Sequence, residues 1–148
     1  MKKIIYIDMD NVLVDFKSGI AKLSKDVQDE YEGHLDDVPG IFSLMEPMEG
    51  AIDAFNKLSQ LEKYDVYILS TAPWDNSTAW SAKVEWVKKY LGVNGYKRLI
   101  LSHHKNLNAG DYLIDDRTKN GADKFIGEHI HFGQDKFLTW NEVLDYLI

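Results

Sequence analysis

Short apolar segments alternate with longer amphipathic segments along the chain. Four runs rich in β-branched and aromatic residues are almost continuously apolar, which is typical of strands covered on both faces of a parallel sheet. These predicted strands are Lys3–Asp8, Asp65–Ser70, Arg98–Ser102 and Asp111–Asp115. A shorter run, His129–Phe132, predicts an additional edge strand.

Helical periodicity occupies stretches between the predicted strands. Apolar residues recur at three- and four-residue steps within Ile52–Leu61 and within Trp80–Leu91, where Trp80 and Val84 begin the apolar face. A third helix is predicted at the C-terminal end, because Thr139–Glu142 has the pattern of a capping box. Strands that alternate with helices favour right-handed crossovers. The predicted fold class is therefore α/β, a Rossmann-like parallel sheet flanked by helices.

The distance between the first two predicted strands exceeds what one crossover helix needs. More than fifty residues separate Asp8 from Asp65, whereas a crossover takes about a dozen or more. The excess contains an amphipathic segment and an acidic loop from Glu30 to Gly40. We therefore expect one domain over residues 1–148, with residues 14–48 as a small helical cap inserted after the first strand, over the carboxyl edge of the sheet.

Composition and charge exclude several classes of protein. The 148 residues include no cysteine, which excludes a disulfide framework, thiolate metal sites and a cysteine nucleophile. The formal net charge of −7 disfavours nucleic-acid polymers and anionic membranes as partners, because it repels both. The apolar N-terminal run ends at Asp8, too early for a signal peptide or a membrane span, so a cytoplasmic location is expected.

Pairs of acidic residues follow the first and the fourth predicted strand. The first strand ends in Asp8-Met9-Asp10 and the fourth in Asp115-Asp116, and the carboxyl ends of parallel strands face one crevice. Two carboxylates at about 4 Å repel each other by roughly 4 kcal/mol at an effective dielectric near 20. A hard divalent cation cancels this repulsion, and oxygen-only ligands favour Mg²⁺ over zinc. For either pair alone, helix capping or a solvated strand end is the alternative.

Polar residues at the ends of the other two strands indicate a phosphate site. Ser70 and Thr71 end the second strand, and Lys105 follows the third. Hydroxyl donors and a lysine charge are groups that a phosphoryl group needs. His129 and His131 would share one face of the edge strand, but no third metal ligand is spaced with them. We interpret these two histidines as a surface pair.

The order of these motifs resembles that of the haloacid dehalogenase-like phosphohydrolases. The pattern of DxD after the first strand, Thr after the second, Lys after the third and DD after the fourth covers the chain from Asp8 to Asp116. The segments IIYIDMDNVLVDF, MEPMEGAIDAFNKL, ILSTAPW and YLIDDRTKNG are similar to those of the 5′(3′)-deoxyribonucleotidase branch. Members of the branch usually have glycine at the position of Asn11, and asparagine tolerates left-handed backbone better than most residues.

The resemblance implies a Mg²⁺-dependent phosphomonoesterase of (deoxy)nucleoside monophosphates. Asp8 would be the nucleophile that forms an aspartyl-phosphate, and Asp10 would be the general acid and base. The Asp8 carboxylate, the Asp10 backbone carbonyl and the Asp115 carboxylate would bind Mg²⁺. Asp116 would act from outside the ligand shell, by orienting a metal-bound water or Lys105.

Five residues are assigned to substrate binding. Thr71 and Lys105 would neutralise charge on the phosphoryl oxygens, with Ser70 beside them. The branch has an aromatic residue that lines the nucleoside pocket at the position of Phe16. Trp74 follows the Thr motif at the same edge and could stack on a base or sugar. Exposed aromatic residues on the insertion could also mediate a homodimer.

Two alternatives remain open from the sequence. The same catalytic residues would hydrolyse another small phosphate ester, such as a sugar phosphate, because substrate choice depends on the insertion. A phospho-acceptor signalling module also combines carboxylates, Ser or Thr, and Lys around Mg²⁺ on a parallel sheet. Such modules have their acid pair and acceptor Asp in a different chain order and need no general acid two residues after the nucleophile, so the hydrolase is favoured.

Overall fold

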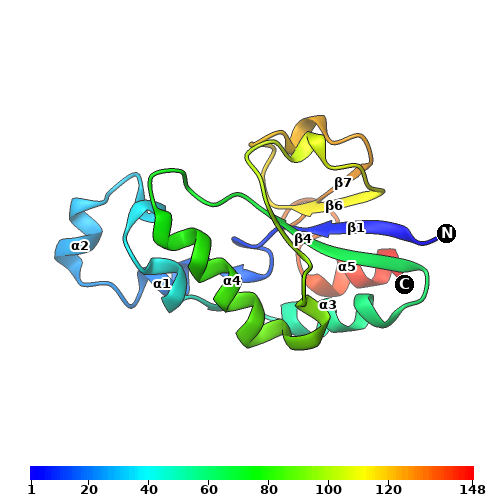
Figure 1. The fold of residues 1–148 in the computed structure, drawn as a ribbon, viewed down its shortest axis with the longest axis horizontal. Coiled ribbons are helices and arrows are strands. Elements are labelled where there is room, and N and C mark those ends of the chain that lie inside the picture. Colours follow the sequence, from blue (N-terminus) through cyan, green and yellow to red (C-terminus); the bar gives the residue numbers. More distant parts are fainter.

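The computed structural model describes residues 1–148. Its centre is a five-stranded parallel sheet with the strand order β5-β4-β1-β6-β7 (Figure 1). The strands are β1 (Lys3–Ile7), β4 (Tyr64–Ser70), β5 (Leu99–Leu101), β6 (Tyr112–Asp115) and β7 (Glu128–His131). The predicted parallel α/β sheet is confirmed, and every strand end lies within one residue of its predicted position.

Three longer helices cover one face of the sheet. They are α3 (Ala51–Gln60), α4 (Ser77–Leu91) and α5 (Trp140–Leu147), and they lie on the same side of the strands in Figure 1. Their buried residues form one hydrophobic cluster with alternate strand residues such as Ile5 and Ile7, because successive side chains of a strand point to opposite faces. None of the helices combines the length and the apolar character that crossing a membrane requires.

The opposite face of the sheet has a thinner cover. Tyr6 and Leu113 pack there against Phe125 and the 3₁₀ helix Ala122–Lys124. The connections after β5 and β6 contain only 3₁₀ helices, the first of which is Lys105–Leu107. Ten and twelve residues make these two connections, near the lower limit of about a dozen for a crossover. The regular alternation of strands and α-helices therefore ends after β5.

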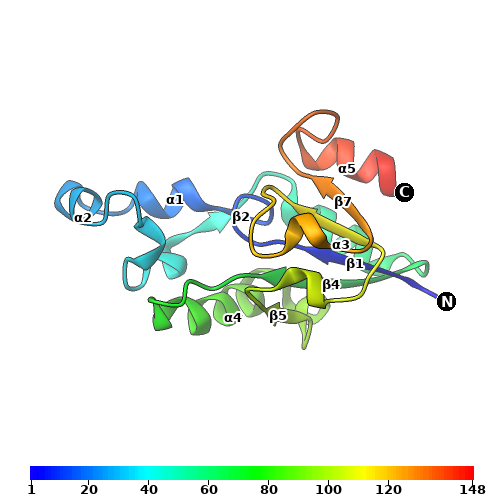
Figure 2. The ribbon, with the colours of Figure 1, turned by 90° about the horizontal axis from the view of Figure 1, so that it is seen from above.

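The segment between β1 and α3 is an insertion beyond the carboxyl end of β1 (Figures 1 and 2). Its elements are, in chain order, β2 (Val14–Asp15), α1 (Phe16–Ile20), α2 (Lys25–Glu30), the 3₁₀ helices Leu35–Asp37 and Ile41–Leu44, and β3 (Glu46–Pro47). β2 and β3 pair antiparallel, where the chain leaves the core and returns to it. The sequence did not predict this pairing, since two-residue strands leave no periodic pattern.

Side chains of α4 and of Asn76, the residue that precedes it, attach the insertion to the core. The amide Nδ2 of Asn76 donates to the carbonyl oxygens of Asp36 at 2.9 Å and Val38 at 3.0 Å. Trp86 Nε1 donates to Met45 O at 3.1 Å. Asn76 is buried, so these bonds form out of contact with water and fix the insertion over the carboxyl edge of the sheet.

Candidate active site

The loop after β1 places two acidic residues at the carboxyl edge of the sheet. The backbone N–H of Asp8 extends the parallel pairing by donating to β6 at 2.9 Å. The backbone N–H groups of residues 12–14 then all donate to Met9 O, at 2.9–3.1 Å. Asn11 adopts φ 63° within this tight turn, the left-handed conformation that asparagine tolerates. As a result, Asp8 and Asp10 line the same small pocket.

Carboxylates from distant parts of the chain meet in this pocket. β1 and β6 are neighbours, with Ile7 opposite Ile114, so the residues that follow these two strands lie side by side. Carboxylate oxygens of Asp8, Asp115 and Asp116 lie within 4.8 Å of one another. The cavity beside them is about 10 Å³, roughly the space that one water molecule needs. Its lining residues are Asp8, Asp10, Thr71, Lys105, Asp115, Arg117, Lys119 and Asn120.

The acid pair at the carboxyl end of β6, Asp115 and Asp116, carries unfavourable electrostatic interactions. Burial raises the pKa values of Asp115 and Asp116 above their ordinary range, and the negative charge of Asp8 raises both further. Oδ1 of Asp116 is buried without a hydrogen-bond partner. The carboxylate oxygens are crowded, and one of them accepts no hydrogen bond. A hard divalent cation fits such a site, because its positive charge offsets the repulsion among the carboxylates. The three carboxylates could therefore bind a metal ion.

Lys105 approaches the same carboxylates from the connection after β5. Its side chain is buried, and Nζ lies 3.1 Å from Asp8 Oδ1 and 2.5 Å from Asp115 Oδ2. Burial lowers the pKa of Lys105, but the two carboxylates outweigh this effect and raise it overall, so the side chain is a cation. The backbone N–H of Lys105 donates to Asn120 O at 2.7 Å, which fixes the lysine beside the acids.

The two hydroxyl residues at the carboxyl end of β4, Ser70 and Thr71, have different positions. Thr71 lines the pocket, and its Oγ1 donates to Ser102 O at 2.7 Å. Ser70 is fully buried, and its Oγ accepts a hydrogen bond from Lys83 Nζ at 2.9 Å. A direct phosphate contact, as the sequence predicted for Ser70, gains no support from this position, because the side chain is fully buried and does not line the pocket.

The sequence analysis missed Lys83, a fully buried lysine on α4. Its Nζ donates to Asp10 Oδ1 at 3.2 Å and lies 4.5 Å from the centre of the Phe42 ring. The predicted apolar face of this helix was partly wrong, since Val84 is 38% exposed. The buried face instead includes Lys83 and Trp86. A lysine on the buried face of a helix was the available signal, because such a charge needs a partner.

Replacing Lys83 with methionine should destabilise the protein. Lys83→Met leaves the largely buried Asp10 carboxylate without its cation, and removing one partner of a buried pair costs about 3 kcal/mol. Lys83→Met combined with Asp10→Asn should recover most of this loss, because neither charge remains. Urea unfolding of the four proteins measures the coupling. Strictly additive losses would show that the two side chains do not interact. Lys88→Met, on the exposed side of α4, is the control and should change stability by less than about 0.5 kcal/mol.

Three further pocket residues lie in the loop after β6. Arg117, Lys119 and Asn120 line the cavity together with the acids. Asn120 has φ 56° and Gly121 has φ 83°, and this left-handed turn brings the loop back over the pocket. The sequence analysis quoted this segment but gave its basic residues no role, although two cations directly after an acid pair were a visible signal for anion binding.

Phe16 and Trp74 do not line the acidic pocket. Phe16 begins α1 and packs edge-to-face against Phe42, with 5.8 Å between the ring centres. Trp74 is 78% exposed, and its ring centre lies 6.1 Å from that of His103. His103 follows Ser102, which Thr71 contacts, so Trp74 lies on the rim of the site. Nucleoside binding by Phe16 and Trp74 stays a prediction.

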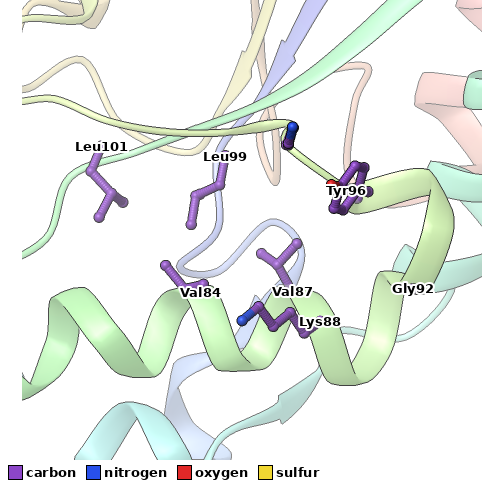
Figure 3. Close-up of a pocket in the computed structure, with 9 residues that line it drawn as sticks. Val84, Val87, Lys88, Gly92, Tyr96, Leu99 and Leu101 are labelled. Carbon is purple, nitrogen blue, oxygen red and sulfur yellow. The ribbon is translucent and has the colours of Figure 1, made fainter.

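A much larger cavity lies elsewhere, between α4 and the edge strand β5 (Figure 3). Its volume is about 430 Å³, and its lining includes Val84, Val87, Leu99 and Leu101. Lys88 is one of its few charged residues, and no acid lines it. Size alone would favour this cavity as the site, but it offers no carboxylate to act as a nucleophile, as a general acid or as a metal ligand. The acidic pocket at the ends of β1 and β6 is therefore the candidate active site.

Comparison with known proteins places the chain in a family. Residues 29–143 match the model of the family described as 5′ nucleotidase, deoxy (Pyrimidine), cytosolic type C protein. The chain belongs to the 5′(3′)-deoxyribonucleotidase family. A protein of Vibrio phage KVP40, described as a candidate 5′(3′)-deoxyribonucleotidase, is 62% identical over 146 residues, which cover 99% of this chain and 85% of the phage protein. The cytosolic-type 5′(3′)-deoxyribonucleotidase of Homo sapiens is 28% identical, with 86% of this chain and 78% of the human protein covered.

Solved structures agree on the fold of this deoxyribonucleotidase-family protein. A haloacid dehalogenase-like hydrolase of Bacillus subtilis superimposes with a TM-score of 0.67 at 13% identity, over 99% of this chain and 98% of the other. A haloacid dehalogenase-like family protein of Streptococcus pneumoniae gives a TM-score of 0.63 at 19% identity, over 99% of each chain. The family model and the similar sequences confirm the resemblance that the sequence motifs carried, and the solved structures confirm the fold.

Proposed function

We propose that this deoxyribonucleotidase-family protein removes the phosphate group from deoxynucleoside monophosphates in a Mg²⁺-dependent reaction. The observation that carries the proposal is the convergence of the carboxylates of Asp8, Asp115 and Asp116 beside Lys105. The family assignment makes the chain a phosphoric monoester hydrolase of the 5′(3′)-deoxyribonucleotidase type. This assignment argues against the phospho-acceptor signalling module and favours nucleotides over sugar phosphates.

The metal would be bound by oxygen atoms at the ends of β1 and β6. We assign the Asp8 and Asp115 carboxylates and the Asp10 backbone carbonyl as ligands. The position of Asp116 supports its carboxylate as a further ligand, whereas the sequence placed it outside the ligand shell. The B. subtilis hydrolase of the same fold is bound to magnesium, which supports this choice of ion. Bound Mg²⁺ neutralises charge on the phosphoryl oxygens.

Asp8 would act as the nucleophile. Its carboxylate oxygen forms a bond to phosphorus while the bond between phosphorus and the ester oxygen of the nucleotide breaks, which gives an aspartyl-phosphate and a nucleoside. Lys105 Nζ, 3.1 Å from Asp8 Oδ1, holds this carboxylate in place by a hydrogen bond. A water molecule then attacks the phosphorus of the aspartyl-phosphate, which releases inorganic phosphate and restores Asp8.

Asp10 would transfer the protons in both steps. It gives its proton to the departing ester oxygen and then takes a proton from the attacking water. Burial raises the pKa of Asp10 above its ordinary value, although the nearby Lys83 cation opposes the rise. The Lys83 ammonium also fixes the carboxyl group by its hydrogen bond. Thr71, Lys105 and Arg117 would contact the phosphoryl oxygens from around the pocket, where they reduce the negative charge of the transferring group.

A phosphate-release screen tests this function. We expect faster release from deoxynucleoside monophosphates than from ribonucleotides or sugar phosphates, since the family is named for deoxynucleotides. Chelation with EDTA should abolish release, and excess Mg²⁺ should restore it, because the crowded carboxylates need the cation. Equal rates on sugar phosphates would contradict the nucleotide assignment, and EDTA-resistant turnover would contradict the metal site.

Location and assembly stay predictions. The description of the matched family and the name of the human relative include the word cytosolic, which supports the cytoplasmic location inferred from the sequence. A small-molecule nucleotide is the partner that the family implies, and the net charge of −7 argues against a nucleic-acid polymer. The homodimer predicted from aromatic residues on the insertion would be tested by size-exclusion chromatography with light scattering.

A further inference from the structure

His129 and His131 lie on β7, the strand next to the acid pair Asp115 and Asp116. In the β6–β7 register, His129 is opposite Leu113 and His131 is opposite Asp115. The two rings are on the same face of the sheet and are stacked, with 5.2 Å between centres and 20° between planes. Both side chains are half-buried. They lie on the edge strand, as the sequence analysis expected, but their side chains are not fully exposed.

Each imidazole bonds to the backbone of one acidic residue. His129 Nε2 lies 3.1 Å from Asp115 O, and His131 Nε2 lies 2.9 Å from Asp116 O. A carbonyl oxygen only accepts hydrogen bonds, so Nε2 is the donor in both cases. The bond exists in the neutral Nε2–H tautomer and in the imidazolium alike, and it does not depend on the charge of the ring. Burial lowers the pKa of His129, which favours the neutral form for this residue.

The arrangement of the three carboxylates requires the backbone between Asp115 and Asp116 to depart from regular strand geometry. Successive residues of a regular strand point to opposite faces, yet oxygens of both Asp115 and Asp116 lie within 4.8 Å of an Asp8 oxygen. The strand pleat must therefore break after Asp115, where β6 ends. Repulsion among the carboxylates favours their separation. Other contacts must therefore hold the backbone of Asp116 in place.

The backbone ladder between β6 and β7 stops before it reaches that peptide. Phe132 N donates to Asp115 O at 3.0 Å, and Asp115 with His131 is the last registered pair of the two strands. His131 Nε2 then donates one residue farther along, to Asp116 O. The side chain of His131 thus adds one hydrogen bond between the two segments beyond the end of the strands. His129 Nε2 is a second hydrogen-bond donor to Asp115 O, besides Phe132 N.

We propose that His129 and His131 are positioning residues that hold the Asp115 and Asp116 peptides, so that both carboxylates face the metal. The inference rests on the proposed function, since it concerns the metal site of that reaction. The histidines contact neither the metal nor the substrate. Their effect on metal affinity passes through two backbone carbonyls, and loss of such outer partners typically weakens metal binding by about 10–100-fold.

Titration calorimetry with Mg²⁺ on the purified protein, without substrate, tests the inference. His131→Phe keeps a planar ring for stacking but removes the donor, and we expect the dissociation constant for Mg²⁺ to rise by about tenfold or more. His131→Gln offers an amide donor and should recover much of the affinity. His34→Phe makes the same chemical change on the exposed surface of the insertion and should leave the affinity unchanged. Thermal unfolding of each variant without metal separates lost folding from lost positioning.

The outcomes distinguish the inference from the proposed function. Wild-type protein that binds no Mg²⁺ would overturn the metal site and the inference together. Mg²⁺ binding that is intact in wild type and equally strong in folded His131→Phe would overturn the inference alone. Nitrogen-15 NMR of the imidazole rings gives a second readout: protonated Nε2 on both rings in the metal-free protein supports the two hydrogen bonds. A dominant Nδ1–H tautomer on either ring would overturn them.

Discussion

Replacing Asp8 with asparagine is expected to reduce phosphate release from deoxynucleoside monophosphates by about 10⁴-fold or more, which corresponds to about 5.4 kcal/mol. The amide has the shape of the carboxylate but is a poor nucleophile, so the aspartyl-phosphate cannot form in the usual way. The fold should persist. Asp8→Asn reduces the repulsion on Asp115 and Asp116, and Lys105 keeps its contact with Asp115 Oδ2 at 2.5 Å.

Steady-state phosphate release, with substrate and Mg²⁺ at saturation, measures this effect. Asp145→Asn makes the same change on the exposed surface of α5 and should retain wild-type turnover. Circular dichroism and thermal unfolding show whether Asp8→Asn is folded. Folded Asp8→Asn protein with turnover within tenfold of wild type would refute Asp8 as the nucleophile.

Replacing Asp10 with asparagine should affect substrates according to their leaving group. With nucleotides, whose alkoxide leaving group needs a proton, we expect a loss of about 10²–10⁴-fold in the first step. With p-nitrophenyl phosphate, the first step should be largely spared, because nitrophenolate departs without protonation. The second step still lacks its general base. Rapid mixing should therefore show a burst of nitrophenolate close to the enzyme concentration, followed by slow turnover.

The control for Asp10→Asn concerns stability, because the substitution leaves Lys83 buried without its carboxylate partner. The double variant Lys83→Met with Asp10→Asn removes both charges and should show the same difference between the two substrates. Equal losses on nucleotides and on the aryl phosphate, without a burst, would show that Asp10 does not protonate the leaving group.

The parallel sheet and the meeting point of the acids were accessible from the sequence. Continuous apolar runs identify buried strands by composition alone, and the capping box at Thr139 is present as predicted. The convergence of Asp8 and Asp115 followed from one rule, that parallel strands end at a common edge. The rule needs only the strand positions, so it placed residues more than one hundred positions apart without any tertiary information.

The contacts made by helix faces and by strand edges were not accessible. The sequence analysis gave Lys83 no role, because the face that α4 buries depends on how the helix packs against the sheet and the insertion. His129 and His131 looked like surface residues, because their partners are backbone carbonyls that any sequence contains. Nothing in the identity of a residue records which carbonyl lies beside it.

The sequence by itself determined which charged residues lie at the ends of the strands, because local hydrophobic patterns identify the strands and their order along the chain. These residues limit the chemistry that the site can perform. Only the tertiary structure decided how that charge is balanced. Burial sets the cost of each carboxylate, and a few ångströms decide whether Lys83 or Lys105 offsets it. Such distances result from the packing of the whole chain, which no local pattern specifies.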